Sequence, residues 1–182
     1  MNNLLQLPPL SLYIHYPWCL KKCPYCDFNS HDSEVQDGYI KALLKDLDED
    51  LKYVQQREIS SIFIGGGTPS LMNVKEVNDL FIGLTDRLDF ASNIEITLEA
   101  NPGTFEVDRF AEYRNVGINR LSIGVQSFND KQLKFLGRIH SASEAQNAII
   151  EAQNVGFENL NIDLMYGLKG QSIDECTNDI AT

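Results

Sequence analysis

The chain has 182 residues, of which 43% are hydrophobic and 23% are charged, a composition typical of folded proteins and not of fibrous or disordered ones. Its 15 Lys and Arg stand against 26 Asp and Glu, and a net charge of -11 would repel a phosphate backbone, so we do not expect a nucleic acid partner. The opening MNNLLQLPPL lacks a secretion signal, and no apolar run reaches the roughly 18 residues that span a bilayer. These features predict a cytoplasmic location.

Five short apolar segments rich in β-branched residues predict β-strands. They cover residues 11–16, 60–64, 94–98, 120–125 and 159–164, and each is followed by a turn containing Gly, Pro or Asn. Amphipathic segments separate them. Strands that alternate with helices are typical of a parallel sheet in an α/β fold.

Two of the amphipathic segments show an apolar face with helical spacing. The first face is formed by Ile40, Leu44, Leu47, Leu51 and Val54, and the second by Val74, Val77, Phe81, Leu84 and Leu88. Capping-box spacing predicts helix starts at Ser33 with Gln36, Ser141 with Glu144, and Ser172 with Glu175.

About five strand-helix units are present, and the predicted last helix stops at Thr182. An eight-unit barrel takes about 250 residues, and a six-unit barrel would need a sixth strand. We therefore expect residues 1–182 to form one α/β core domain, an amino-terminal fragment with its sixth strand and carboxyl-terminal domain absent. A complete, doubly wound five-stranded sheet is the alternative.

Three of the four cysteines lie within eight positions after the first predicted strand, in the pattern C-x3-C-x2-C formed by Cys19, Cys23 and Cys26. Because a reducing cytoplasm disfavours disulfides, this clustering indicates a metal site or a redox role. Iron-sulfur clusters usually take four cysteines, so three would leave one iron open to another ligand. A zinc site completed by Cys176 or His31 is the alternative, although zinc sites usually show paired C-x2-C units.

The second predicted strand runs directly into three glycines, Gly65 to Gly67, followed by Thr68 and Pro69. Glycines in this position allow a ligand to approach the backbone closely, or they form a simple sharp turn. The segment lacks both the lysine of a P-loop and the spacing of a dinucleotide fingerprint, so it does not predict a phosphate site.

A polar residue follows the apolar run of each of the three later strands: Glu99, Gln126 and Asp163. The carboxyl ends of parallel strands build the ligand site in α/β folds. We therefore expect these three residues, the cysteines and the glycines to meet on one rim. A capping or surface role is the alternative for each residue taken alone.

Six motifs together resemble the radical S-adenosylmethionine (SAM) superfamily, and within it the oxygen-independent coproporphyrinogen III oxidases and their relatives. They are YIHYPWC, KKCPYCDFNSH, GGGTPS, LEANPGT, GVQSF and LGRIH, which extend the resemblance from about residue 8 to 170. It implies a partial (β/α) barrel, about five units of a six-unit three-quarter barrel. It also implies a [4Fe-4S] cluster on Cys19, Cys23 and Cys26, and bound S-adenosylmethionine.

The resemblance also implies roles for individual residues around S-adenosylmethionine. Gly66, Gly67 and Thr68 would line its methionine part, and Glu99, Gln126 and Asp163 would engage its polar groups. Arg138 matches a position that contacts S-adenosylmethionine, with a solvated surface arginine as the alternative. Apolar cover over the cluster would come from Tyr13, Trp18, Tyr25 and Phe28, although Trp18 also suits an ordinary core position.

One departure from the oxidases bears on function: they extend the motif to C-x3-C-x2-C-x-C, whereas here Asp27 and Phe28 follow Cys26. CPYCDFNSH instead resembles the heme chaperone branch, which binds heme and delivers it to apoproteins. We therefore expect a heme chaperone, with heme or a porphyrinogen as ligand. Oxidative decarboxylation of coproporphyrinogen III is the alternative, and whether the protein is an enzyme stays open. Cys176 is expected to be an incidental thiol.

Overall fold

A computed structural model describes residues 7–103 and 107–182. The start of MNNLLQLPPL and Thr104 of LEANPGT lie outside the described residues. The elements follow the order β1 (Leu10–Tyr16), α1 (Tyr39–Val54), β2 (Ile59–Gly66), η2 (Pro69–Leu71), α2 (Val74–Thr85), β3 (Phe90–Ala100), α4 (Phe110–Val116), β4 (Arg120–Gln126), α5 (Asp130–Phe135), α6 (Ala142–Asn154), β5 (Asn159–Leu164) and α7 (Ile173–Ala181).

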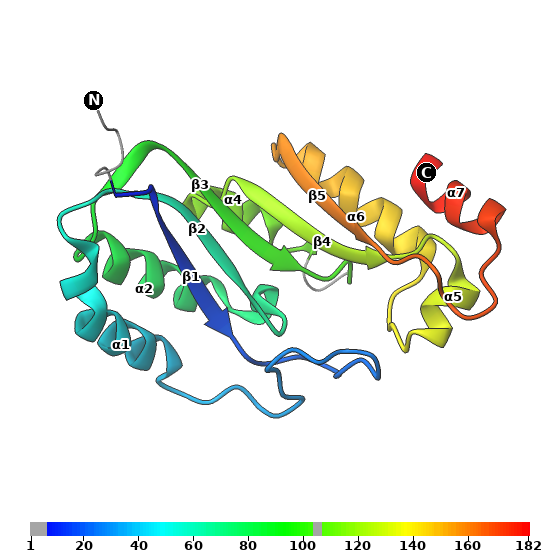
Figure 1. Cartoon of the computed structure of the whole chain (residues 1–182), viewed down its shortest axis with the longest axis horizontal. Coiled ribbons are helices and arrows are strands. Elements are labelled where there is room, and N and C mark those ends of the chain that lie inside the picture. The colour runs from blue at the N-terminus through cyan, green and yellow to red at the C-terminus, as the bar shows by residue number, and fades with distance from the viewer. Residues whose placement is uncertain (1–6, 104–106) are drawn as a thin grey trace.

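The five strands form one sheet in the order β1-β2-β3-β4-β5, and every neighbouring pair is parallel. All five predicted strands are confirmed. Because the spatial order equals the chain order, the crossovers all run in one direction, and α1, α2, α4 and α6 lie on one face of the twisted sheet (Figure 1). This arrangement confirms the partial barrel and rules out the doubly wound alternative, in which the strand order reverses.

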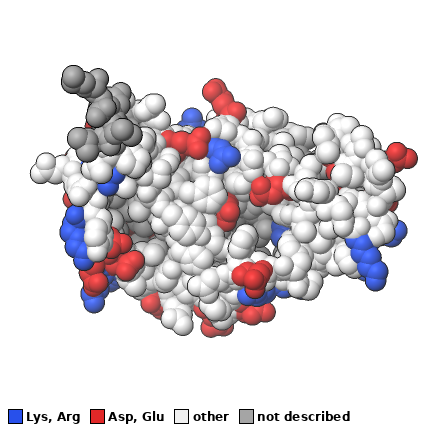
Figure 2. Space-filling model, viewed as in Figure 1, with Lys and Arg blue, Asp and Glu red and all other residues white. Residues whose placement is uncertain are grey.

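Alternating strand residues bury one face of the sheet beneath the helices. Ile64, Leu98 and Ile123 are fully buried on this face and pack with Leu80 of α2 and Phe110 of α4 in one hydrophobic core. The residues in between, including Glu99 and Ser122, face the opposite side, where Figure 2 shows acidic and basic side chains scattered over a largely uncharged surface. Period-two alternation thus separates the apolar core from the open face of the sheet, which carries polar residues.

Two of the three predicted capping boxes are confirmed, and one is wrong. Ser141 caps α6 and Ser172 caps α7, each with its glutamate bonded back to the cap backbone. The predicted start at Ser33 fails because α1 begins at Tyr39, after Gly38 with a φ of 85°. Tertiary contacts set this start, since the Tyr39 hydroxyl donates to the His15 carbonyl at 2.8 Å and its ring packs 4.5 Å from that of Trp18.

Within the described residues, no helix is both long enough and apolar enough to cross a membrane.

Candidate functional site

The loop that leaves β1 carries the three clustered cysteines, and we call residues 17–31 the cysteine loop. Its base is closed by two backbone hydrogen bonds: Cys19 donates to the His31 carbonyl at 2.9 Å, and His31 donates to the Pro17 carbonyl at 2.7 Å. From inside, the Lys22 ammonium donates to the carbonyls of Phe28 and Ser30 at 3.3 and 3.0 Å. These contacts help to hold the loop in shape, together with the His15 ring of β1, which hydrogen-bonds the Asn29 carbonyl through Nε2 at 2.8 Å.

The glycine turn, residues 65–68, lies directly against this loop. Gly67 and Thr68 donate to the carbonyls of Tyr16 and Trp18, both at 2.7 Å. A β-carbon on Gly67 would lie 2.5 Å from the Trp18 carbonyl oxygen, so only glycine fits there. Gly66 has a φ of 118°, and a β-carbon would lie 2.6 Å from the His15 ring. Gly67 is thus explained by close backbone packing between two loops, and Gly66 by its positive φ and the neighbouring His15 ring.

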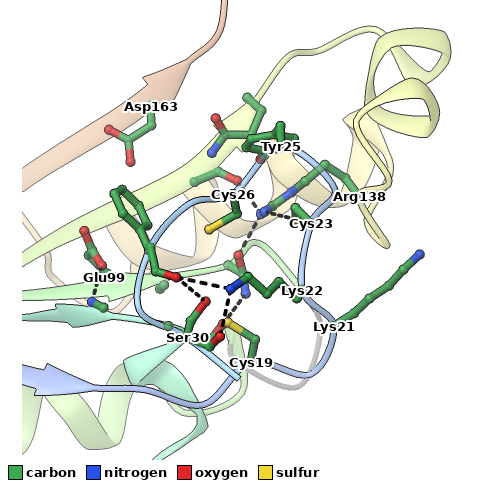
Figure 3. Close-up of a pocket in the computed structure, with 18 of the residues that line it drawn as sticks. Cys19, Lys21, Lys22, Cys23, Tyr25, Cys26, Ser30, Glu99, Arg138 and Asp163 are labelled. Carbon is green, nitrogen blue, oxygen red and sulfur yellow. Dashed lines mark hydrogen bonds between the residues drawn. The ribbon is translucent and has the colours of Figure 1, made fainter. Parts of the chain in front are cut away.

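A cavity of about 460 Å³ opens between the cysteine loop, the glycine turn and the carboxyl ends of β3, β4 and β5. This volume lies within the range of small-molecule sites. The predicted residues that line it are Cys19, Cys23, Tyr25, Cys26, Phe28, Gly66, Gly67, Thr68, Glu99, Gln126, Arg138 and Asp163. Figure 3 shows the cysteines facing Glu99 and Asp163 across the cavity, with Lys21 extending away from the other labelled residues. The predicted rim is brought together as expected.

Glu99 and Asp163 are the acids of this cavity. One carboxylate oxygen of Glu99 accepts a hydrogen bond from the Gly66 backbone N–H at 3.1 Å. Burial raises the pKa of the Glu99 carboxyl and the Asp163 charge adds to the shift, whereas the Gly66 hydrogen bond opposes it. Asp163 accepts from Asn161 at 2.7 Å and from Ser122 at 3.4 Å. Both acids line the cavity.

Arg138 supplies positive charge on the opposite side of the cavity. Its guanidinium donates to the Asn101 side-chain oxygen at 2.7 Å and to the Gly124 carbonyl at 2.8 Å, and it reaches the Cys23 sulfur at 3.5 Å. Its Nε is buried and has no hydrogen-bond partner among the described residues. The surface alternative for Arg138 is therefore wrong, because the side chain points into the site.

Asn101 is a cavity residue that the sequence reasoning missed, although it lies within the motif LEANPGT. Its amide nitrogen donates to the Thr68 hydroxyl at 3.2 Å while its oxygen accepts from Arg138. It therefore links the glycine turn to the arginine. Lys22, Ser30, Ser122 and Gly124 also line the cavity and were not singled out; they lie on the same loop or strand ends as the predicted residues.

Of the four predicted covering aromatics, Tyr25 and Phe28 line the cavity. Tyr13 is not among its lining residues; its hydroxyl bonds His15 Nδ1 at 2.9 Å, and its ring stacks on Phe63. Trp18 is 5% exposed and packs on Tyr16 and Tyr39, as its core alternative predicts. Alternation along β1 separates these residues. Trp18 continues the buried series of Ile14 and Tyr16, whereas Tyr13 lies on the open side of the strand and farther from its carboxyl end.

The donor set fits an iron-sulfur cluster. Cys19, Cys23 and Cys26 are free, partly exposed thiols that line one cavity. In residues 7–103 and 107–182, no three His, Cys, Asp or Glu side chains converge closely enough to hold one metal ion. A cluster binds its cysteines through different iron atoms and does not need that convergence.

The fold and the cavity together define an α/β partial-barrel protein with a thiol-lined cavity at the carboxyl ends of its strands. The family model of the Radical SAM superfamily matches residues 13–181, and the chain belongs to that superfamily. Membership implies a [4Fe-4S] cluster and S-adenosylmethionine.

The chain is 54% identical over 180 residues to "Heme chaperone HemW" of Escherichia coli K12, covering 97% of this chain and 48% of that protein. It is 53% identical over 183 residues to "Heme chaperone HemW" of Haemophilus influenzae, covering 96% and 48%. Among solved structures, coproporphyrinogen III oxidase (HemN) from Escherichia coli matches with a TM-score of 0.80 and 31% identity, over 95% of this chain and 41% of that one. The chain spans about half the length of the relatives it matches.

Proposed function

We propose that the chain binds a [4Fe-4S] cluster through Cys19, Cys23 and Cys26 and binds S-adenosylmethionine beside it. The observation that carries the proposal is the shared cavity, which collects three free thiols, a glycine turn and two carboxylates from separate parts of the chain. When bound and reduced, such a cluster supplies an electron to the sulfonium of S-adenosylmethionine. The three-cysteine set would leave one iron open to the amino and carboxylate groups of S-adenosylmethionine.

The cavity residues divide by the chemistry that they offer S-adenosylmethionine. The backbone of Gly66 and Gly67 would contact the methionine part, together with the Thr68 hydroxyl. Arg138 suits the ligand carboxylate, because a guanidinium forms charge-assisted hydrogen bonds with carboxylates. Glu99, Gln126 and Asp163 would accept or donate hydrogen bonds to the remaining polar groups, and Tyr25 would cover the site. Tyr13 is left out of this set because it does not line the cavity.

We further propose that the protein of which this chain forms the radical SAM part is a cytoplasmic heme chaperone that delivers heme to apoproteins. Two relatives that are more than half identical carry that name. The absence of a fourth cysteine in the motif after Cys26 also supports this branch. Coproporphyrinogen III oxidation is the second candidate, and the 31% identical solved structure supports it.

Anaerobic reconstitution with iron and sulfide tests the cluster proposal. We expect about one four-iron cluster per wild-type chain, and loss of that iron in Cys19→Ala, Cys23→Ala and Cys26→Ala. Cys176→Ala is the matched control, because Cys176 lies in α7 and does not line the cavity. Iron that survives loss of Cys23, or that follows Cys176, would contradict the assignment.

Two further measurements test the ligand and the branch. Adding S-adenosylmethionine to the reduced cluster should change its electron paramagnetic resonance spectrum, and an unchanged spectrum at saturation would argue against an open iron. Transfer of bound heme to an apocytochrome without anaerobic consumption of coproporphyrinogen III supports the chaperone. Consumption of the porphyrinogen supports the oxidase.

A further inference from the structure

Ser127 and Phe128 belong to the motif GVQSF, but unlike Gly124 and Gln126 of that motif they do not line the cavity. We propose that Asp179 of α7 is a positioning residue, which holds this turn so that Gln126 faces the cavity. The inference rests on the proposed S-adenosylmethionine site, because Gln126 is assigned to that ligand.

The backbone at Gln126 needs support. Its φ is 71°, in the left-handed region that residues with side chains rarely adopt. The register between β4 and β5 also shifts between Ile123 and Gln126, so the regular ladder of hydrogen bonds is interrupted there. Strained conformations of this kind persist only where surrounding contacts over-determine them. Contacts on both sides of Gln126 are therefore expected.

Both carboxylate oxygens of Asp179 are used on this turn. The Ser127 hydroxyl donates to Asp179 Oδ2 at 2.7 Å, and the Phe128 backbone N–H donates to Asp179 Oδ1 at 2.8 Å. Asp179 is 4% exposed and Ser127 is fully buried. The two residues following Gln126 are thus fixed by one buried side chain that lies about fifty positions later in the chain.

Other hydrogen bonds hold the backbone carbonyls of Val125 and of Gln126 itself. The buried His140 ring, through Nε2, donates to the Val125 carbonyl at 3.1 Å, and the Met165 backbone N–H donates to the Gln126 carbonyl at 2.8 Å. These two contacts come from the segments before α6 and after β5. Three segments of the chain therefore form hydrogen bonds with the turn, through His140, Met165 and Asp179. Of these three residues, Asp179 is the one that lies on α7.

Asp179 is an unusual residue for a helix to bury. It is the one buried residue of α7, whereas Ile173 and Ile180 are 85% and 73% exposed. In the part of the chain that the structure describes, no Lys, Arg or His lies within ion-pair distance of it. A buried carboxylate is costly unless hydrogen bonds compensate it. Both hydrogen bonds to the Asp179 carboxylate come from the Gln126 turn. This indicates that Asp179 is buried there because it holds that turn.

Asp179→Ala and Ser172→Ala separate positioning from simple loosening of α7. Ser172 caps the same helix by accepting from the Glu175 backbone N–H at 3.1 Å, and it does not touch the turn. We expect Asp179→Ala to weaken S-adenosylmethionine binding to the reconstituted protein by about 2- to 12-fold, the range of one ordinary hydrogen bond. Ser172→Ala should stay within about twofold of wild type. Equal losses in both variants would overturn the proposal.

A double-mutant cycle identifies the route of the effect. Gln126→Ala should show a similar loss, and Asp179→Ala combined with Gln126→Ala should lose no more than Gln126→Ala alone, since both act through one side chain. Additive losses would overturn the proposal. If Asp179→Ala does not fold, Ser127→Ala removes one of the two contacts and takes its place in the cycle.

A measurement without ligand separates this inference from the proposed function. The Phe128 and Met165 amides should exchange with solvent deuterium faster in Asp179→Ala than in wild type and in Ser172→Ala, because the turn loses its anchor. Unchanged exchange would overturn the anchoring role even if the site binds S-adenosylmethionine. If wild type shows no S-adenosylmethionine binding, the proposed function is wrong, and exchange alone decides whether Asp179 holds the turn.

Discussion

Replacing Glu99 by glutamine tests the ligand site without touching the cysteines. One oxygen of the Glu99 carboxylate accepts from the Gly66 backbone N–H at 3.1 Å, and the glutamine oxygen can keep that contact. The other oxygen has no hydrogen-bond partner among the described residues, and Glu99 lines the cavity. In Glu99→Gln this oxygen is replaced by an amide nitrogen. That nitrogen is a donor, so it cannot accept a hydrogen bond from a ligand hydroxyl.

The expected magnitude follows from this single contact. A hydrogen bond to a charged acceptor contributes about 1.5 to 3 kcal/mol. At about 1.4 kcal/mol per tenfold change, its loss weakens S-adenosylmethionine binding by about 10- to 150-fold. Stability should not fall with it, because burial and the Asp163 charge already disfavour the ionised Glu99, as its raised pKa indicates. We therefore expect Glu99→Gln to lower the affinity for S-adenosylmethionine without lowering the melting temperature.

The assay is an anaerobic titration of S-adenosylmethionine into reconstituted wild type and Glu99→Gln, with iron content and melting temperature as controls. Glu95→Gln is the matched control variant. Glu95 lies on the same face of β3, is exposed, and accepts a hydrogen bond from Asn159 at 3.1 Å instead of lining the cavity. Equal dissociation constants for Glu99→Gln and wild type would remove Glu99 from the site and refute the argument from the strand ends.

Two further predictions concern stability. Burial and the Arg138 charge lower the pKa of His140 to about 4, whereas an unfolded histidine titrates near 6.5. The unfolded chain therefore takes up a proton on this histidine at a higher pH than the folded chain does. This contribution to the free energy of unfolding is fully present above about pH 6.5, and about 3 kcal/mol of it is lost as the pH falls toward 4. His140→Gln, which keeps a donor for Val125, should flatten this part of a melting-temperature profile, and an unchanged slope would exclude His140 as its cause. Gly67→Ala should cost about 1 to 3 kcal/mol and reduce retained iron, because its β-carbon would lie 2.5 Å from the Trp18 carbonyl oxygen; a wild-type melting curve with full iron would show that the two loops can separate freely.

The sequence by itself determined the parts of this protein that depend on local pattern. All five strands and the alternation of strands with helices followed from short apolar, β-branched runs separated by amphipathic segments, and the parallel sheet followed from that alternation. The cysteine loop was evident from spacing within eight positions. Glu99, Gln126 and Asp163 were found because parallel strands share one carboxyl edge, so their position along each strand already implied a common location.

Only the tertiary structure decided features that join distant segments. The link from Thr68 through Asn101 to Arg138 connects three different loops, and the contact between Asp179 and Ser127 spans about fifty positions. The failed cap at Ser33 has the same origin, because packing of Tyr39 on Trp18 sets where α1 begins. Capping-box spacing and apolar periodicity predict only the helix or strand to which a residue belongs. Which side chains meet across elements depends on twist, register and turn conformation, and these are fixed only when the whole sheet has assembled.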